Sequence, residues 1–403
     1  MHWRRSGTHR NVVRTRLAHR RAHDPFLRLR SPKRSPKRAT KGRRRSVRIM
    51  KHPANLKDHS LESLRERFVS EGVPAYRAAQ IMNWLYKRGT EDIHQMTDLS
   101  VALREQLASV WETRAVDVRK AERSVDGTQK LALATKDERL IEAVIIPEAK
   151  RNTLCISTQV GCALACDFCA TGTMGFTRNL TTAEIVDQVC RAKERVGEDE
   201  TISNVVFMGM GEPLLNLAAV KESIRIMIDP RAMGLAPRRI TVSTAGVVPK
   251  ISELIAMAPI NLAVSLHAAT NAVRDILVPI NKKFPLEVLL GLLRSDENVT
   301  RKRPVFFEYT LLEGVNDSID DAKRLPGLLR DIPCKMNLIP ANSHPGGRYQ
   351  APAQDVMDRF AETVYNGGMR VTLRRSRGAD IAAACGQLAN TETTAGTSVE
   401  IPI

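Results

Sequence analysis

The sequence predicts an α/β fold built around a full or partial barrel of parallel strands. From Asn152 onward, strand-like apolar runs alternate with helical ones, which is typical of parallel strands joined by helical crossovers. Six or seven such units fit a barrel, whose chemistry lies at the carboxyl ends of its strands. Polar motifs follow several of the runs directly. The runs are TLCISTQ, NVVFMGM, RRITVST, INLAVSL, VFFEYTLL, CKMNLIP and GMRVTLRR.

Composition indicates a soluble globular protein. A chain of 403 residues with 43% hydrophobic content has room for two or three domains. The apolar run LEVLLGLL (286–293) is far shorter than the roughly 18 residues of a membrane span, so we expect no membrane association. Seven cysteines, an odd number, and no apolar signal segment favour a reducing, cytoplasmic location.

The net charge of +18 is concentrated at the N-terminus. Residues 1–49 hold 18 of the 62 Lys and Arg residues but only one of the 44 acidic ones, so the remainder is nearly neutral. A basic segment rich in Arg, Ser and Pro buries too little apolar surface to fold, and we expect a disordered leader. RNA binding and targeting are two interpretations of it. We favour a third, in which translation begins at Met50.

A small helical domain is predicted after the leader, over residues 50–120. Apolar spacing and Pro or Gly punctuation predict helices over 60–72 and 74–89, and a third helix follows from about Ser100 to Val110. RNA contact and a solvated helix face account equally well for its exposed aromatic and basic residues, which are Tyr76, Arg77, Lys87 and Arg88.

A change to period two predicts a β-hairpin extension over residues 121–150. The runs TQKLALAT (128–135) and RLIEAVIIP (139–147) alternate in polarity and flank a short polar turn. The barrel domain is then expected over 151–388, with a loose polar tail over 389–403.

Three cysteines crowd into GCALACDFCATG (161–172), at the carboxyl end of the first predicted barrel strand. A closed zinc site usually has four ligands, and a disulfide scaffold needs cysteines in pairs. A [4Fe–4S] cluster also normally takes four thiolates, so three would leave one iron open for a substrate. On spacing alone, a zinc-stabilised RNA-binding protein and coincidence both remain alternatives.

The spacing C-x3-C-x2-C, with an aromatic residue before the third cysteine, resembles the signature of the radical S-adenosylmethionine (SAM) enzymes. The resemblance implies that Cys162, Cys166 and Cys169 hold a [4Fe–4S] cluster whose free iron binds SAM. One electron then cleaves SAM into methionine and a 5′-deoxyadenosyl radical, so an electron donor of flavodoxin or ferredoxin type is expected.

Further polar motifs end the later strands. MGMGEP (208–213) resembles the SAM-binding GGEP element, and its glycines allow a ligand to approach the backbone. TVSTAG, VSLHA and NLIPAN follow at the ends of other strands. The SAM contacts that the resemblance implies are Gly211, Glu212, Ser243, Ser265, Leu266, His267 and Asn342.

The chain is more narrowly similar to the dual-specificity ribosomal and transfer RNA adenine C2 methyltransferases, over about residues 55–388. LCISTQVGCALACDFCATG, VVFMGMGEPLLN and RRSRGADIAAACGQL are the most specific elements. The resemblance implies a partial (β/α)6-type radical SAM barrel, with 23S rRNA and tRNA as substrates. A monomer is expected, because no heptad seam indicates a coiled-coil dimer. The related C8 adenine methyltransferases share the cysteine cluster and remain an alternative, although the N-terminal helical domain favours C2.

The resemblance also implies roles for Cys385, Cys155 and Glu142. Adenine C2 lies between two ring nitrogens and is electrophilic, so it cannot attack the methyl group of SAM. Cys385 would take a methyl group from one SAM, and the radical from a second SAM would activate it for addition to C2, forming an RNA–protein crosslink. The Cys155 thiolate would resolve the crosslink by forming a disulfide with Cys385. Glu142 matches the proton acceptor, although Cys155 could also serve.

The remaining predictions concern packing and RNA contact. Cys190 and Cys334 are interpreted as buried packing residues. Arginines near Cys385 and in the HPGGRY loop could hold RNA phosphates. They are Arg374, Arg375, Arg377 and Arg348.

Overall fold

The computed structural model describes residues 54–149, 151–197 and 200–389, which belong to one compact unit. The predictions for the basic leader and for residues 390–403 of the tail lie outside these residues. The division into domains stays a prediction.

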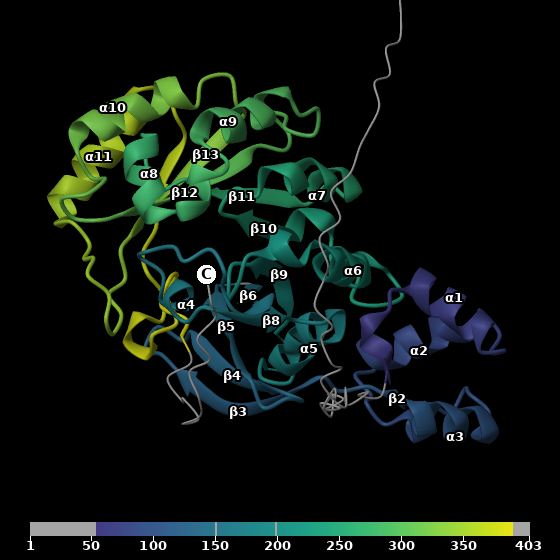
Figure 1. The fold of residues 1–403 in the computed structure, drawn as a ribbon. Helices are drawn as coiled ribbons and strands as arrows, with labels where there is room; N and C mark the ends of the chain where they lie inside the picture. Colours follow the sequence, from purple (N-terminus) through teal and green to yellow (C-terminus); the bar gives the residue numbers. More distant parts are fainter. Residues whose placement is uncertain (1–53, 150, 198–199, 390–403) are drawn as a thin grey trace, which may run out of the picture. The chain divides into compact units, whose positions relative to one another are not determined.

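A single mixed sheet forms the centre of the described chain, and it contains ten strands there (Figure 1). Seven of them are parallel and correspond to the seven predicted runs. Within the described residues β14 pairs only with β13, so the parallel part is an open, partial barrel, as predicted. In chain order the parallel strands are β6 (Arg151–Cys155), β9 (Ile202–Phe207), β10 (Ile240–Thr244), β11 (Asn261–Ser265), β12 (Val305–Leu311), β13 (Cys334–Pro340) and β14 (Val371–Leu373).

Three antiparallel strands extend the sheet from β6. β4 (Gln129–Thr135) and β5 (Leu140–Glu148) form the predicted hairpin, and β5 pairs with β6. The edge strand β3 (Val116–Arg123) was not predicted. Its sequence VDVRKAER is mostly charged, and most of its residues are exposed on both faces of the strand, so the apolar alternation that identifies a strand is missing.

Helices cover the outer side of the parallel strands (Figure 1). The first long one, α5, begins with a capping box, in which Thr181 and Glu184 each accept a hydrogen bond from the other's backbone N–H. These helices are α5 (Thr182–Lys193), α6 (Leu217–Ile228), α7 (Ile251–Met257), α8 (Asn271–Leu277), α9 (Leu286–Ser295), α10 (Ile319–Leu328) and α11 (Gln354–Asn366).

Shorter elements complete the described fold. One small sheet pairs a strand near the N-terminus with one after the helical module, and another flanks the cysteine loop. They are β1 (Ala54–Asn55) with β2 (Trp111–Glu112), β7 (Gln159–Gly161) with β8 (Phe176–Asn179), and the one-turn helix α4 (Ala170–Thr173).

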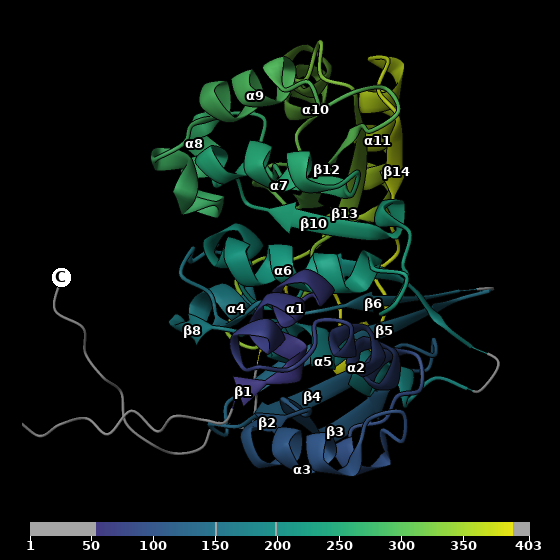
Figure 2. The same cartoon turned by 90° about the vertical axis from the view of Figure 1, so that its right-hand side faces the viewer.

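The N-terminal module contains the three predicted helices, α1 (Leu61–Ser70), α2 (Arg77–Tyr86) and α3 (Val101–Val110). Helix α2 begins three residues later than Pro74, because the preceding residues form tight turns. In both views α1 and α2 lie beside α5 and α6 (Figure 2). The apolar core of the module includes Val186 of α5 and Ile226 of α6, so the module is packed onto the barrel.

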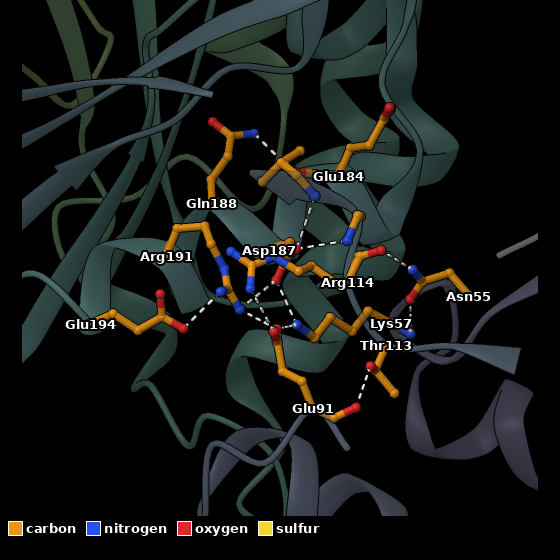
Figure 3. A network of polar contacts seen from close by, with 12 residues as sticks. Asn55, Lys57, Glu91, Thr113, Arg114, Glu184, Asp187, Gln188, Arg191 and Glu194 are labelled. Atoms are coloured by element: carbon orange, nitrogen blue, oxygen red, sulfur yellow. Dashed lines mark hydrogen bonds and ion pairs between the residues drawn. The ribbon is translucent and has the colours of Figure 1, made fainter. Parts of the chain in front are cut away.

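A buried ion cluster joins the module to α5 (Figure 3). Asp187 is 0% exposed and pairs with Lys57 at 2.5 Å and with Arg191 at 3.5 Å. Its second oxygen accepts hydrogen bonds from the backbone of Ala115 (2.7 Å) and Val116 (3.0 Å). Burial alone would raise the pKa of Asp187, but the two cations outweigh burial and lower it. The two cations and the two backbone N–H groups therefore offset the cost of burying the Asp187 carboxylate.

Replacing Asp187 by alanine is expected to lower the free energy of unfolding by about 3–5 kcal/mol, because Lys57 would stay buried without its partner. Asp355→Ala, which removes an exposed pair with Arg359, should have a much smaller effect. Chemical denaturation at neutral pH measures both. The folded-state pKa of Asp187 lies below its ordinary value, so the difference should shrink as the pH falls below about 4. An equal loss of unfolding free energy in the two variants would contradict a stabilising role for the buried ion cluster.

None of the helices in the described part of the chain combines the length and the apolarity that a bilayer span requires.

Candidate functional site

A cavity of about 160 Å³ opens at the carboxyl ends of the parallel strands. The loop after β6 supplies one wall, and residues at the ends of β9, β10 and β11 supply others, as the barrel prediction requires. Eight of the predicted cluster and SAM residues line it together. They are Cys162, Cys166, Cys169, Gly211, Glu212, Ser243, Ser265 and His267.

The three clustered cysteines are free thiols and half-buried. Backbone hydrogen bonds shape their loop, including Cys162 N–H to Gly175 O (2.7 Å) and Cys169 N–H to Cys166 O (3.1 Å). Burial raises the pKa of Cys162 to about 11 and also raises the pKa of Cys166 well above its ordinary value. Among the described residues, no group of three or more His, Cys, Asp or Glu side chains converges on a single metal ion. The thiols face a shared cavity, and soft sulfur ligands suit iron–sulfur clusters.

The MGMGEP turn brings its backbone close to the β6–β7 connection. Gly211 has φ 96°, and a Cβ there would lie 2.4 Å from the Cβ of Gln159, so only glycine fits. Glu212 is buried, and its carboxylate accepts hydrogen bonds from the backbone of Leu214 (3.0 Å) and Ala245 (2.8 Å). Each carboxylate oxygen can accept a second bond, so Glu212 retains capacity for an ammonium group.

His267 is held in one neutral form. Its backbone is left-handed (φ 55°), and Nδ1 accepts a hydrogen bond from Thr310 N–H at 2.9 Å. Burial and the charge of Arg274 lower its pKa to about 3, so the proton lies on Nε2 at neutral pH. The Phe168 ring contacts the imidazole edge-on, with centroids 4.6 Å apart. The aromatic residue before the third cysteine therefore orients a strand-end residue.

Two of the predicted SAM contacts do not line the first cavity. Leu266 is fully buried and does not line the cavity, although its carbonyl oxygen accepts a hydrogen bond from Arg274 at 3.0 Å. Asn342 lines neighbouring cavities instead, and its Nδ2 donates to the carbonyl oxygen of Cys385 at 3.1 Å.

A second cavity of about 410 Å³ adjoins the first. It is lined by Cys155 of β6 and by Arg374, Arg375 and Arg377. Five residues line both cavities, namely Met208, Glu308, Ile339, Arg374 and Cys385. Cys385 therefore lies where the two cavities meet.

Cys155 and Cys385 come close together although 230 residues separate them. Burial raises the pKa of Cys155, and the neighbouring Cys385 raises it further. Cys155 is buried, whereas Cys385 is exposed at the cavity surface. Both are thiols here, which is the reduced form of the predicted pair.

Hydrogen bonds tie the Cys385 segment to the cysteine loop. Ala170 N–H donates to Gly386 O (2.8 Å), and the Thr171 hydroxyl donates to Leu388 O (2.5 Å). Figure 1 shows this yellow segment beside α4. The two parts of the predicted site are therefore anchored to each other.

Glu142 lines neither of these cavities. It lies on β5, two residues from Val144, the residue paired with Cys155. Its carboxylate is 3.5 Å from Lys130, and burial raises its pKa to about 7. Proton-acceptor chemistry suits such a group, but its distance from the cavities leaves this role a prediction.

Comparison with known proteins identifies the fold and the family. The model of the ribosomal RNA large subunit methyltransferase N-terminal domain matches residues 54–113, and the radical SAM superfamily model matches residues 156–325. The dual-specificity RNA methyltransferase RlmN of Geobacter sulfurreducens is 48% identical over 334 residues, which cover 83% of this chain and 91% of that protein. The chain belongs to the RlmN family. RlmN of Geotalea uraniireducens is 46% identical over 83% of this chain and 96% of its own.

A solved structure agrees with this assignment. The radical SAM methyltransferase from Sphaerobacter thermophilus is 43% identical, with a TM-score of 0.79, over 83% of this chain and 99% of that chain. The predictions of an RNA methyltransferase of the radical SAM superfamily and of its barrel fold are thus confirmed. An RlmN-family enzyme uses a [4Fe–4S] cluster and SAM.

Sequence reasoning on this RlmN-family chain missed Arg274. Its guanidinium is fully buried and donates hydrogen bonds to the carbonyl oxygens of Leu266 (3.0 Å), Ala245 (2.7 Å) and Ser265 (2.9 Å). It thereby holds the ends of β10 and β11 together. Glu308 was also not singled out from the sequence. Its only sign of function in the sequence is a charged residue inside the apolar run VFFEYTLL.

The predicted RNA contacts are dispersed. Arg348 pairs with Asp167 of the cysteine loop. In the module, the guanidinium of Arg88 lies 4.0 Å from the Trp84 ring centroid, and that of Arg77 lies 4.7 Å from the Tyr76 ring centroid. Trp84 is buried in the core of the module, whereas Tyr76 is 58% exposed, so of the two rings only Tyr76 is open to an RNA base, and this contact remains a prediction.

Proposed function

We propose that this RlmN-family enzyme methylates C2 of a specific adenine in 23S rRNA and in tRNA, with Cys385 as the methyl carrier. One observation carries the proposal: Cys385 lies where a cavity lined by the three clustered cysteines meets a second cavity lined by Cys155 and arginines. A residue in that position can receive a methyl group from one side and deliver it to the other.

The first cavity suits the cluster and SAM. Cys162, Cys166 and Cys169 would each bind one iron, which leaves a fourth iron for the amino and carboxylate groups of SAM. Glu212 would accept hydrogen bonds from the SAM ammonium group, and Ser243, Ser265 and His267 would contact the rest. The cluster and SAM together supply the methyl group and an organic radical. A flavodoxin or ferredoxin would supply the electron.

The second cavity suits the target adenine. Arg374, Arg375 and Arg377 line it and carry the positive charge that RNA phosphates require. A base in a folded RNA must leave its stack to reach such a cavity, which is the usual solution for enzymes that modify bases. Arginines on several elements would hold the flanking backbone.

The two cysteines of the second cavity would divide the chemistry. The Cys385 sulfur takes a methyl group as a nucleophile, and a hydrogen atom is removed from that methyl group before its carbon bonds to C2. C2 loses its proton, and the adduct radical gives up one electron, which the oxidised cluster would accept. The Cys155 thiolate then attacks the Cys385 sulfur. The bond from that sulfur to the methylene carbon breaks, the carbon keeps the electron pair and takes up a proton, and release of the methylated RNA leaves a disulfide. Each turnover would therefore consume two SAM molecules and require reduction of the disulfide. Cys155 or Glu142 would accept the C2 proton.

Mass spectrometry of RNA tests the proposed regiochemistry. The anaerobically purified protein, with iron and sulfide measured, is incubated with SAM, a reductant and either 23S rRNA or tRNA. We expect 2-methyladenosine in both RNAs. A methyl group at C8 would instead assign the chain to the related C8 enzymes, and zinc in place of iron would contradict the proposal altogether.

A further inference from the structure

A carboxyl group without an assigned role lies at the junction of the two cavities. Glu308 of β12 is 6% exposed and lines both cavities, as Cys385 does. Asn337 stands beside it in register on β13, and its Nδ2 donates to Glu308 Oε1 at 2.8 Å. Glu308 Oε2 is buried and has no hydrogen-bond partner among the described residues. Asn337 thus fixes the carboxyl group and leaves one oxygen available.

The other carboxyl groups that line the two cavities in the described chain are already engaged. Each oxygen of Glu212 already accepts a backbone hydrogen bond, and its remaining capacity is the one proposed for the SAM ammonium group. Glu148 forms an ion pair with Arg151 at 2.6 Å and is half exposed to water. A buried, unpaired carboxyl oxygen is costly unless a ligand or a neighbouring group uses it. Glu308 is therefore the carboxyl group placed to take part in chemistry at Cys385.

The Cys385 thiol must lose its proton before it can attack a methyl group, because the thiolate is the nucleophile. Cys385 opens onto the cavity but is enclosed by the protein around it, which raises the pKa of its thiol, and the charge of Glu308 is the next largest cause of the same rise. The charge of Arg374 opposes both. At neutral pH Cys385 is consequently a thiol, and a nearby base would accelerate its reaction.

We propose that Glu308 is the general base that removes the thiol proton of Cys385 as its sulfur attacks the methyl group of SAM. The inference rests on the proposed role of Cys385 as methyl carrier. The S–H bond breaks, its proton moves to Glu308 Oε2, and its electron pair forms the new bond from sulfur to the methyl carbon. The bond between that carbon and the SAM sulfonium breaks, and its electron pair neutralises the sulfonium.

The surroundings of the pair support proton transfer. Burial raises the pKa of Glu308 as well, which brings it nearer to that of a thiol and improves its match as a base. The other charged or titratable groups that interact with Glu308 or Cys385 are Arg374 after β14, Cys155 on β6 and Cys169 on the cysteine loop. None of these three offers a carboxylate.

Methylation of Cys385 without RNA tests the inference. The cluster-loaded protein is mixed with SAM and no reductant, and the rate of methyl addition to the Cys385 peptide is followed by mass spectrometry at several pH values. Glu308→Gln keeps the shape of the side chain and an oxygen for Asn337. We expect it to slow methylation about 100-fold or more at neutral pH, with recovery as the pH rises. Glu313→Gln, an exposed change just beyond β12, should leave the rate unchanged.

Whether Glu308→Gln slows or accelerates methylation of Cys385 distinguishes a general base from a negative charge that only repels the thiolate. If Glu308 only repels the thiolate, Glu308→Gln lowers the pKa of Cys385, and methylation becomes as fast as in the parent or faster, which would overturn the inference. In the Glu308→Gln protein, alkylation of Cys385 by iodoacetamide, measured without SAM, should be slowed in the same way.

Glu308→Asp keeps a carboxyl group and should methylate Cys385 at a rate within about tenfold of the parent. A rate as low as that of Glu308→Gln counts against proton transfer. A parent protein that never methylates Cys385 contradicts the proposed function instead.

Discussion

Replacing Cys385 by alanine is expected to abolish methylation of RNA, with a loss of at least about a thousandfold. The variant lacks the sulfur that would accept the first methyl group, and C2 of adenine cannot take a methyl group from SAM directly. The side chain is exposed at the cavity surface, so its removal should not unfold the protein. Mass spectrometry of digested RNA, and of the protein after incubation with SAM, measures both methyl transfers.

Cys334→Ala provides the matched control. Cys334 is a half-buried thiol at the start of β13, at the opposite end of that strand from the cavities. Methylation by this variant should equal that of the parent. The Cys385→Ala protein should also retain its iron, because the three cluster cysteines are intact. Substantial RNA methylation by Cys385→Ala would exclude a methyl-carrier mechanism.

Replacing Cys155 by alanine is expected to convert a catalytic enzyme into one that stays bonded to its RNA. Cys385 and the first cavity remain, so the methyl group should still be carried to C2 and form the crosslink. The sulfur that would attack Cys385 is missing, and the crosslink should therefore accumulate. A band of protein joined to RNA in a denaturing gel, sensitive to nuclease, measures the adduct.

Cys190→Ala is the control for this second substitution. Cys190 is on α5, where it packs against the apolar core of the N-terminal module rather than against either cavity. It should release methylated RNA as the parent does. If Cys155→Ala releases product at the parental rate without a stable adduct, another group resolves the crosslink.

The parallel strands were predictable because their signal is local. Each is a short run rich in apolar residues, most of which are buried in β10, β11 and β12, and the polar motifs that follow these runs identify the catalytic end of the sheet. The cysteine loop was predictable from its spacing, the aromatic residue before its third cysteine and its place directly after the first parallel strand. The edge strand β3 was not predictable, because most of its residues are exposed and charged on both faces, which leaves no apolar alternation.

The rest of the site depends on contacts between distant residues. No local pattern indicates that Arg274, a helical residue, is buried against three strand-end carbonyl groups. Nor does any pattern reveal that Glu308 shares both cavities with Cys385. Which residues become neighbours here depends on strand pairing across the sheet and on the closure of long loops. The spacing of apolar residues along the sequence contains no information on either.

The hydrogen bonds between α4 and the Cys385 segment have a consequence for synthesis of the protein. Thr171 and Leu388 are 217 residues apart, so the strands and helices of the barrel can leave the ribosome and fold while the cysteine loop still lacks this partner. The radical-generating half of the enzyme is therefore completed before its acceptor half. If Cys385 is the methyl carrier, a nascent or prematurely terminated chain would have a place for SAM but no sulfur to receive the methyl group, and any radical formed there would attack only the protein itself.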